Sequence, residues 1–272
     1  RRNAIIRRLP AVEALGSVTV ICSDKTGTLT RNEMTVQRVI CADHVFEVGG
    51  VGYAPGGDFS LDGNIVDADH YPALSMATRA SVLCNDARLR EDDGVWRVEG
   101  DPTEGALLVL GGKAGFTQHV GDAAWPRIDA IPFESQHRFM ATHHRDSDGE
   151  PWIFVKGAPE RILDVCAFQM NHDGGTSPLD VDTWHRMATA TAAQGLRLLA
   201  LACKRTAPEG ARLSFADVET GYTLLALVGL IDPPREEAIR AVHECHHAGI
   251  RVKMITGDHV ETARAIGAQL AI

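Results

Sequence analysis

The octapeptide Ser23–Thr30, with the sequence Ser-Asp-Lys-Thr-Gly-Thr-Leu-Thr, combines a carboxylate, several hydroxyls and a glycine in one short stretch. It follows the apolar run Val18–Cys22, whose β-branched residues and abrupt polar end are typical of a buried strand. Asp24 is therefore expected at the carboxyl end of a strand, where open α/β sheets place their ligands. Such a loop can hold a phosphate with its backbone donors while a carboxylate attacks it. The alternative is a capped turn that carries one exposed aspartate.

This octapeptide resembles the phosphorylation motif of P-type ATPases, which are ion pumps that pass through an aspartyl-phosphate. The resemblance implies that Asp24 is the nucleophile and that Lys25 belongs to the same catalytic motif. It also implies that Thr26 offers its backbone carbonyl to Mg²⁺ and its hydroxyl to the phosphate, so Asp24 and Thr26 are the expected metal ligands. The wider stretch from Leu9–Glu13 to Asn32–Thr35 resembles the type II, cation-transporting branch. The implied cofactors are ATP and Mg²⁺.

A second strand–turn–helix pattern follows the segment Asp232–Arg235, Asp-Pro-Pro-Arg. We predict a helix over 235–247, a buried strand over 250–255 and a helix over 259–270, which with the first strand form a doubly wound α/β unit. The residues expected to face inward are spaced three and four apart: Ala238, Ile239, Val242 and Cys245 or His246, then Val260, Ala263, Ile266 and Leu270. Thr256-Gly257-Asp258 forms the turn after the second strand. The resemblance assigns Thr256 and Gly257 to the phosphate, and Asp258 to ordering the site and the nucleotide ribose.

The segment between these two halves does not alternate strictly between strands and helices, which indicates an α+β domain on an antiparallel sheet. Strands are predicted over 36–40, 45–48, 138–143, 152–156, 196–202 and 222–230, and helices over 71–84, 103–114, 159–166 and 181–194. The glycine-rich stretches 49–63 and 172–178 are predicted loops. We therefore expect three segments: 1–32 and 232–272 form an incomplete phosphorylation domain, and 33–231 forms an inserted nucleotide-binding domain. The resemblance makes the phosphorylation domain haloacid-dehalogenase-like.

Four motifs of the inserted segment resemble the nucleotide-binding domain of the same family. The first is Gly100–Leu107, in which Asp101 is a good N-cap, Pro102 suits the first helical position, and Glu104 lies three residues after the cap. A capping box explains most of this pattern. The resemblance adds a role for Glu104 as acceptor for the adenine amino group.

The second motif is Pro132–Ser135, before a predicted strand that carries Arg138. Its aromatic residue, Phe133, would ordinarily belong to the core, but the resemblance implies that it stacks on adenine. The family often has a basic residue at the position of Ser135. We therefore expect that one phosphate contact is missing or that Arg138 supplies it.

The third and fourth motifs are Lys156–Glu160 and Gly195–Leu201. Lys156 ends an apolar strand, and Gly157 allows a ligand or a backbone segment to approach closely. The resemblance places Lys156 at the floor of an ATP pocket and gives Arg197 a phosphate-side contact. The alternatives are a solvated lysine and an edge arginine whose stem is packed while its head stays in water.

Composition limits the classes of partner. The chain has 272 residues and a net charge of −9, which argues against nucleic acid as a partner. Its six cysteines form no CxxC pair, so we expect reduced core residues and neither a disulfide framework nor a zinc site. No stretch reaches the roughly 18 apolar residues of a membrane helix. Because the family consists of integral membrane pumps, we expect a soluble piece from the cytoplasmic face of a membrane. Its partners would be ATP and the membrane helices of a parent chain, with no obligate protein partner.

The leading interpretation is the ATP-binding and phosphorylation region of an ATP-driven cation pump. The later lysine and the Gly-Asp-Gly-x-Asn-Asp motif of the family are absent, so we expect this piece to bind nucleotide without turning it over. One alternative is a soluble haloacid-dehalogenase-like phosphatase, although such enzymes usually carry a second aspartate where this chain has Thr26. The other alternative is a catalytically silent nucleotide-binding module.

Overall fold

The computed structural model describes residues 17–206, 212–257 and 260–272. The described residues form two compact units, one from the parts of the chain up to Asn32 and from Asp232 onward, and the other from Glu33–Ile231. The predicted resemblance at Leu9–Glu13 and the predicted site residue Asp258 lie outside the described residues.

The smaller unit is built on two parallel strands, β1 (Val20–Asp24) and β15 (Arg251–Ile255), in a register that pairs Asp24 with Ile255. The compact turn η1 (Lys25–Leu29) follows β1, and the helices α7 (Glu236–His247) and α8 (Val260–Gln269) complete the unit. The order of strands and helices agrees with the expected pattern, but the expectation that both strands are buried is wrong, because no residue of β1 and only Val252 of β15 is buried. The parallel pairing brings the carboxyl ends of both strands to one edge.

The core of the smaller unit contains Val242, Val252, Ile266 and Leu270, all buried. The expectation that Val260 faces inward is wrong. Its side chain is 62% exposed, because Val260 opens α8 and the packed stripe of the helix begins after it. Ile21 and Ile255 are also exposed, so part of the apolar surface of β1 and β15 is uncovered within the described residues.

The larger unit is built around one mainly antiparallel sheet, as predicted. The main path runs β5-β4-β3-β2-β14-β13-β10-β9-β8, and β11 and β12 join it beside β14. The strand bounds are β2 Thr35–Cys41, β3 His44–Val48, β4 Phe59–Leu61, β5 Asn64–Val66, β8 Arg127–Glu134, β9 Phe139–Arg145, β10 Pro151–Gly157, β11 Cys166–Met170, β12 Thr176–Pro178, β13 Arg197–Arg205 and β14 Tyr222–Ile231. A separate hairpin consists of β6 (Arg88–Asp92) and β7 (Val95–Glu99).

The central strand β14 has different partners at its two ends. β13 runs antiparallel along one of its edges, whereas the other edge pairs with β11 near Tyr222 and with β2 near Ile231. The β11–β14 pairing is parallel, an exception to the antiparallel expectation. Every residue of β14 except Thr223 is buried, which accounts for its nearly continuous apolar sequence.

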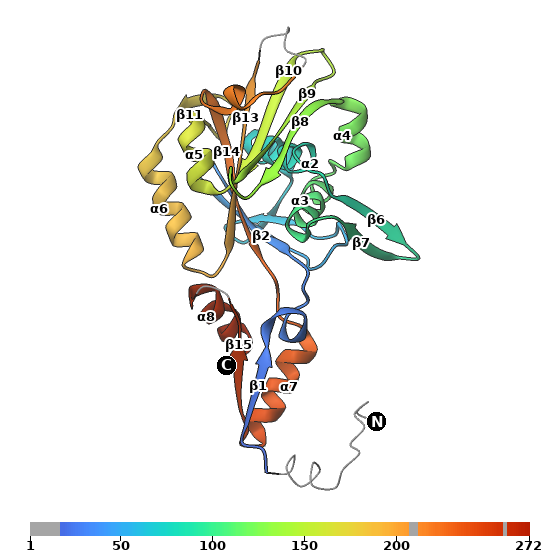
Figure 1. Cartoon of the computed structure of the whole chain (residues 1–272), viewed down its shortest axis with the longest axis vertical. Coiled ribbons are helices and arrows are strands. Elements are labelled where there is room, and N and C mark those ends of the chain that lie inside the picture. The colour runs from blue at the N-terminus through green and yellow to red at the C-terminus, as the bar shows by residue number, and fades with distance from the viewer. Residues whose placement is uncertain (1–16, 207–211, 258–259) are drawn as a thin grey trace. The chain divides into compact units, whose positions relative to one another are not determined.

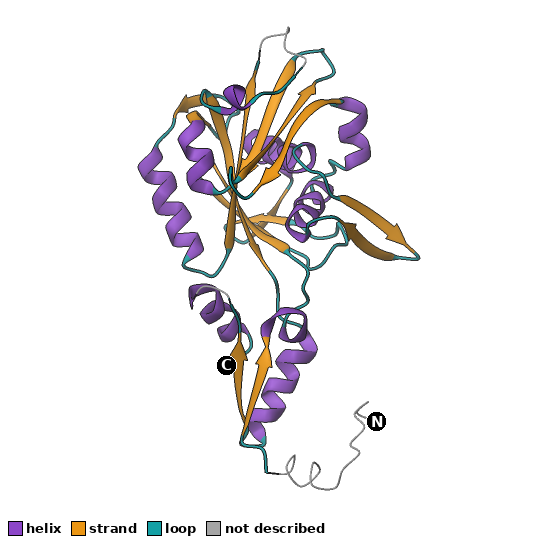
Figure 2. Ribbon diagram, in the orientation of Figure 1, coloured by secondary structure: helices purple, strands orange, loops and turns teal. Residues whose placement is uncertain are grey.

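Helices cover both faces of this sheet (Figures 1 and 2). The helices α2 (Pro72–Leu83), α3 (Pro102–Lys113) and α4 (Gln118–Ala124) lie on one side, and α5 (Pro159–Val165) and α6 (Val181–Ala192) on the other. Two short turns, η2 (Ala68–His70) and η3 (Phe215–Val218), complete the unit. None of the helices within the described ranges is long and apolar enough to cross a membrane.

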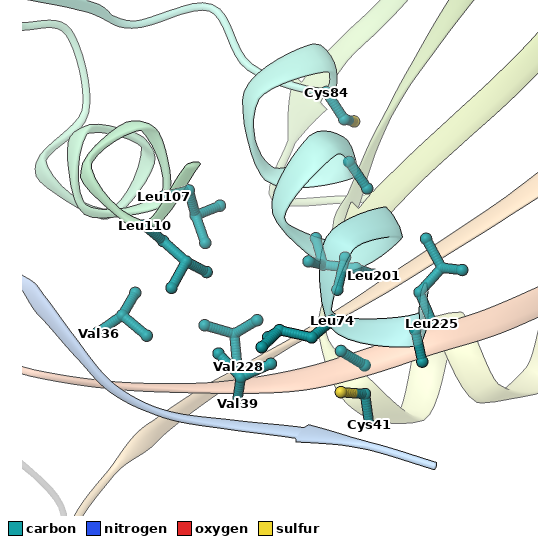
Figure 3. Packing of buried hydrophobic residues seen from close by; sticks show 14 of the residues in the cluster. Val36, Val39, Cys41, Leu74, Cys84, Leu107, Leu110, Leu201, Leu225 and Val228 are labelled. Atoms are coloured by element: carbon teal, nitrogen blue, oxygen red, sulfur yellow. The ribbon is translucent and has the colours of Figure 1, made fainter. Parts of the chain in front are cut away.

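The alternation of side chains in β10 assigns residues to two separate cores. Phe154 packs with the cluster on the α2 and α3 face, which includes Leu74, Leu107 and Val228 (Figure 3). Ile153 and Val155 pack with the cluster on the α5 and α6 face. Because successive side chains of a strand point to opposite faces, Lys156 shares the face of Phe154. This alternation places Lys156 beneath α3.

Several predicted loops contain short strands. The stretch 49–63 includes β4, and the stretch 172–178 includes β12, so both loop predictions are partly wrong. The sequence-based prediction also missed β5, β6, β7, β8, β11 and α4. β5, β6 and β7 have no buried residue, so their sequences carry little apolar signal.

The cysteines differ in burial more than expected. Cys41, Cys84 and Cys203 are buried, and burial raises the pKa of the Cys41 and Cys203 thiols to about 12. These thiols are therefore neutral and unreactive at ordinary pH. Cys22 is exposed, so its assignment to a core is wrong: its side chain lies on an uncovered face of the two-stranded sheet.

Candidate functional site: a pocket beneath helix α3 and a loop after strand β1

A pocket of about 250 Å³ lies within the larger unit. It is lined by ten residues from α3, the α2–α3 region and three strands: Asp86, Asp101, Thr103, Glu104, Pro132, Phe133, Lys156, Gly157, Arg197 and Leu199. The structure thus gathers five residues of the sequence prediction, which come from four separate motifs. Arg138 is not among the lining residues.

Lys156 forms the most enclosed part of this pocket. Only 4% of the residue is exposed, and its ammonium donates to Glu104 Oε1 at 2.5 Å. A buried ammonium is costly unless a charged partner compensates for lost hydration, and Glu104 provides that partner. The alternative of a solvated lysine is therefore wrong for Lys156.

Glu104 is held in the first turn of α3. The Asp101 carboxylate caps this helix by accepting from the backbone N–H of Thr103 at 2.7 Å and of Glu104 at 3.3 Å. The Glu104 carboxylate does not complete a capping box. Its Oε2 instead accepts from the backbone N–H of Asp86 at 3.3 Å, while its Oε1 accepts from Lys156. Glu104 thus presents a charged acceptor at the wall of the pocket.

Phe133 is 54% exposed and lines the pocket. In a regular strand it would share the face of Ile131, which belongs to the core beside α5 and α6. The β8–β9 register shifts between Ile131 and Glu134, and Pro132 and Phe133 both line the pocket. The strand expected after this motif is β9, which carries Met140 but begins just after Arg138, and Phe133 itself lies in β8, a strand that the sequence did not predict. The ring is nevertheless available to a ligand.

Gly157 is required by the neighbouring backbone. A Cβ at this position would come within 2.3 Å of the Arg138 carbonyl oxygen and 2.9 Å of Phe139 Cα. Of the two explanations offered by the sequence, close approach of a backbone segment is therefore sufficient. Gly157 still contributes its surface to the pocket.

Arg138 does not line the pocket and pairs with Glu160 instead. It lies in the turn between β8 and β9 with a φ of 58°, and its guanidinium pairs with Glu160 at 2.8 Å. The predicted substitution of Arg138 for the missing basic residue at Ser135 finds no support in this arrangement. The ion pair with Glu160 accounts for the direction of the side chain.

Arg197 opens β13 and is exposed at the pocket together with the half-buried Leu199. Alternation along β13 gives these two residues the face of Leu201, which belongs to the core beside α2 and α3. Within the described part of the chain, the Arg197 guanidinium makes no hydrogen bond or ion pair. The pocket therefore has a buried ammonium at one place and a free guanidinium at another.

Sequence reasoning missed the other five lining residues as pocket residues: Asp86, Asp101, Thr103, Pro132 and Leu199. Asp86 lies beyond the end of α2 and carries no local signal of a site. Leu199 could have been found from the period-two pattern of its strand, because it lies two residues after Arg197.

A second set of predicted residues lies in the smaller unit, at the carboxyl edge of β1 and β15. Asp24 ends β1 and is exposed, and Thr26 and Gly27 follow in an exposed turn. Gly27 has a φ of 73°, a conformation that favours glycine. The parallel register brings Thr256 and Gly257, which follow Ile255, to the same edge.

Hydrogen bonds with the segment Asp232–Arg235 hold the turn after Asp24 in place. The Thr30 hydroxyl donates to Asp232 Oδ2 at 2.6 Å, and both residues are buried. The Arg235 guanidinium donates to the carbonyl oxygens of Thr30 at 2.8 Å and Gly27 at 3.2 Å. Lys25 is 7% exposed, so it is packed within the turn. The side chains of Asp232 and Arg235 therefore stabilise the loop that follows Asp24.

The donor set near Asp24 suits a hard cation. The Asp24 carboxylate and the loop carbonyls offer oxygen ligands, which Mg²⁺ prefers, and no sulfur or imidazole ligand belongs to the predicted set. The Asp24 carboxylate makes no hydrogen bond to another described side chain or backbone group. Across the described ranges, no three histidine, cysteine or acidic residues converge as a metal cluster.

A family model and individual relatives both match this chain. Residues 73–237 match the family model of the P-type ATPase cytoplasmic domain N. The whole chain is 49% identical to the "cation-transporting ATPase pma1" of Synechocystis sp. and covers 30% of that protein. It is 37% identical to the "calcium-transporting ATPase" of Bacillus subtilis, covering 31% of it, and 39% identical to the human "calcium-transporting ATPase type 2C member 1", covering 28%. The chain thus spans about a third of the length of these relatives or slightly less.

Proposed function

The chain belongs to the P-type ATPase family, and we propose that its larger unit binds ATP for a cation pump that phosphorylates itself on Asp24. The observation that carries this proposal is the pocket that gathers Glu104, Phe133 and Lys156 from motifs far apart in the sequence.

Each group of the pocket has chemistry that suits an adenine nucleotide. The exposed Phe133 ring offers a flat surface on which a purine can stack, an interaction worth roughly 1–3 kcal/mol. The Glu104 carboxylate accepts from a 6-amino group and repels a 6-oxo group. Lys156 supports that carboxylate and supplies positive charge at the floor. Arg197 provides a guanidinium for phosphate oxygens.

The phosphoryl step is proposed for the loop after β1. A carboxylate oxygen of Asp24 attacks the γ-phosphorus of ATP, the bond to the bridging oxygen breaks, and ADP leaves with its electron pair. Thr26, Gly27, Thr256 and Gly257 would hold the phosphoryl oxygens with hydroxyl and backbone groups. Mg²⁺, held by the Asp24 carboxylate and the Thr26 carbonyl, would neutralise the charge of the phosphates.

Thr26 also bears on the alternative of a haloacid-dehalogenase-like phosphatase. Threonine at this position offers no carboxylate to activate water against the aspartyl-phosphate. This favours a long-lived phosphoenzyme, as a pump requires. We propose that the whole protein transports a cation across a membrane, with this part of the chain on the cytoplasmic side.

Calorimetric titration of the chain with ATP tests the pocket. Phe133→Ala should weaken binding by roughly 1–3 kcal/mol through lost stacking. Phe215→Ala is a matched control, because Phe215 is 51% exposed in the same unit but does not line the pocket. It should leave the affinity unchanged. Equal ATP affinity in the Phe133→Ala variant and the parent chain would remove the stacking assignment.

A further inference from the structure

A second cavity, of about 230 Å³ and largely polar, lies beside the pocket and shares Asp86 with it. The polar side chains that matter here are Asn85, Asp86, Gln118 and Arg127. Most of their hydrogen-bonding groups are already paired with protein. This satisfied network argues for a support behind the pocket wall and against a second ligand site.

Arg127 is the centre of this network. Its Nη1 donates to Asp86 Oδ1 at 2.7 Å, and its Nη2 donates to the carbonyl oxygens of Leu83, at 3.3 Å, and of Asn85. One guanidinium therefore holds three acceptors within residues 83–86, at the last residue of α2 and just beyond it. Its charge also suits the carboxyl end of that helix, where carbonyl groups are unpaired.

Two neutral side chains hold the same segment. The Asn85 amide donates to the carbonyl oxygens of Ser81 at 3.0 Å and Glu104 at 2.9 Å, and Asn85 is buried. The Gln118 amide donates to the Ala87 carbonyl at 2.8 Å. The segment after α2 is thereby tied to the first turn of α3, next to the Glu104 side chain.

The Glu104 carboxylate depends on this segment through one contact. The backbone N–H of Asp86 donates to Glu104 Oε2, while Lys156 holds Oε1. The Asp86 N–H is positioned by the ion pair between the Asp86 side chain and Arg127. Arg127 does not line the pocket, so it can affect a ligand only through the segment that it holds, and Asp86 is the residue of that segment that contacts the Glu104 carboxylate.

We infer that Arg127 is a positioning residue that fixes the orientation of the Glu104 carboxylate and thereby sets the preference for a 6-amino over a 6-oxo purine. This inference rests on the proposed function, because it takes Glu104 as the acceptor that reads the purine edge. A carboxylate that accepts a hydrogen bond at each oxygen has a fixed orientation, so its remaining lone pairs keep one direction. A carboxylate held only by Lys156 can turn, which lowers the gain from a 6-amino group and the penalty on a 6-oxo group.

The test is a pair of titrations, with ATP and with GTP, on the whole chain and its variants. Arg127→Met should weaken ATP binding about tenfold and leave GTP binding unchanged or slightly stronger. Arg127→Lys, which keeps the charge but not the fork of donors, should retain part of the preference. Asp86→Asn keeps the backbone N–H but loses the ion pair, so it should shift the ATP-to-GTP ratio in the same direction as Arg127→Met.

Controls separate this inference from simple destabilisation. Arg90→Met removes an exposed arginine whose ion pair with Glu99 lies on the β6–β7 hairpin, and it should change neither affinity. Phe133→Ala should weaken ATP and GTP alike, because stacking does not distinguish the purine edges. If Arg127→Met fails to fold, Arg127→Lys and Asp86→Asn still test the ratio.

An unchanged ATP-to-GTP ratio in the folded Arg127 and Asp86 variants would overturn the inference and leave Arg127 a structural residue. That outcome would not affect the proposed function, which predicts only that the parent chain binds ATP at Phe133. A parent chain that binds neither nucleotide would overturn both.

Discussion

Gly157 illustrates how one residue can serve the fold and border a site at once. Its missing side chain leaves room for the Arg138 carbonyl oxygen, which a Cβ would approach to 2.3 Å. Since that neighbour is backbone, relief would require β9 and β10 to separate. We expect Gly157→Ala to lower the free energy of unfolding by roughly 1–3 kcal/mol, which chemical denaturation can measure.

Gly56→Ala is the matched control for this substitution. Gly56 is exposed, and a Cβ there would meet nothing within 4 Å. The change should leave stability nearly the same or raise it slightly through the smaller entropy of the unfolded chain. Equal stability of the two variants would show that the approach of the β9 backbone to Gly157 does not constrain the protein.

At the scale of elements, β9 carries a buried histidine that makes stability depend on pH. Burial lowers the pKa of His144 from 6.5 to about 4, and the nearby Arg127 charge acts in the same direction. Its Nδ1 lies 2.8 Å from the Trp125 carbonyl oxygen and its Nε2 lies 3.1 Å from the Leu83 carbonyl oxygen; both contacts raise the pKa, but burial outweighs them. Between these two pH values the unfolded chain binds a proton that the folded chain does not.

The sign of the effect follows from that difference. The contribution of His144 is fully present above about pH 6.5 and is lost as the pH falls toward about 4, by up to about 1.4 kcal/mol for each pH unit. His144→Gln should therefore flatten the dependence of unfolding free energy on pH within this window. His143, whose pKa burial also lowers, remains in both proteins as an internal reference. Identical pH dependence in the two proteins would contradict the lowered pKa.

Long apolar elements of this fold could be predicted from the sequence, and short polar elements could not. The runs that became β10, β13 and β14 are strongly apolar, and their burial in the sheet matches that pattern. β6, with the sequence Arg-Leu-Arg-Glu-Asp, carries little apolar signal of its own. A usable cue was nevertheless present, because Asp62-Gly63 and Asp93-Gly94 both adopt positive φ in tight hairpin turns.

Some residues of the candidate site could be predicted from the sequence, and others could not. Glu104, Phe133, Lys156 and Arg197 belong to motifs that can be identified in the sequence alone. Asp86 and Arg127 act through contacts between segments about forty residues apart, which no local pattern encodes. The place of Arg138 in the sequence predicts a pocket residue, but its positive φ and its ion pair with Glu160 direct it elsewhere.

At the scale of the whole molecule, the two groups of site residues belong to different units. The pocket residues all lie within Glu33–Ile231, whereas Asp24 and Thr256 lie in the unit formed by the two ends of the chain. The net charge of −9 does not oppose nucleotide binding, because the Lys156 ammonium and the Arg197 guanidinium are placed locally at the pocket. We therefore expect nucleotide recognition to be a property of the larger unit.

The most direct test of that expectation is a map of backbone amide chemical shifts during titration of the whole chain with ATP. We expect saturable shifts centred on the amides of Asp86, Glu104, Phe133 and Lys156, with the core amides of α6 unchanged. Shifts centred outside the pocket, or none at saturating ATP, would contradict the assignment of this pocket as the nucleotide site.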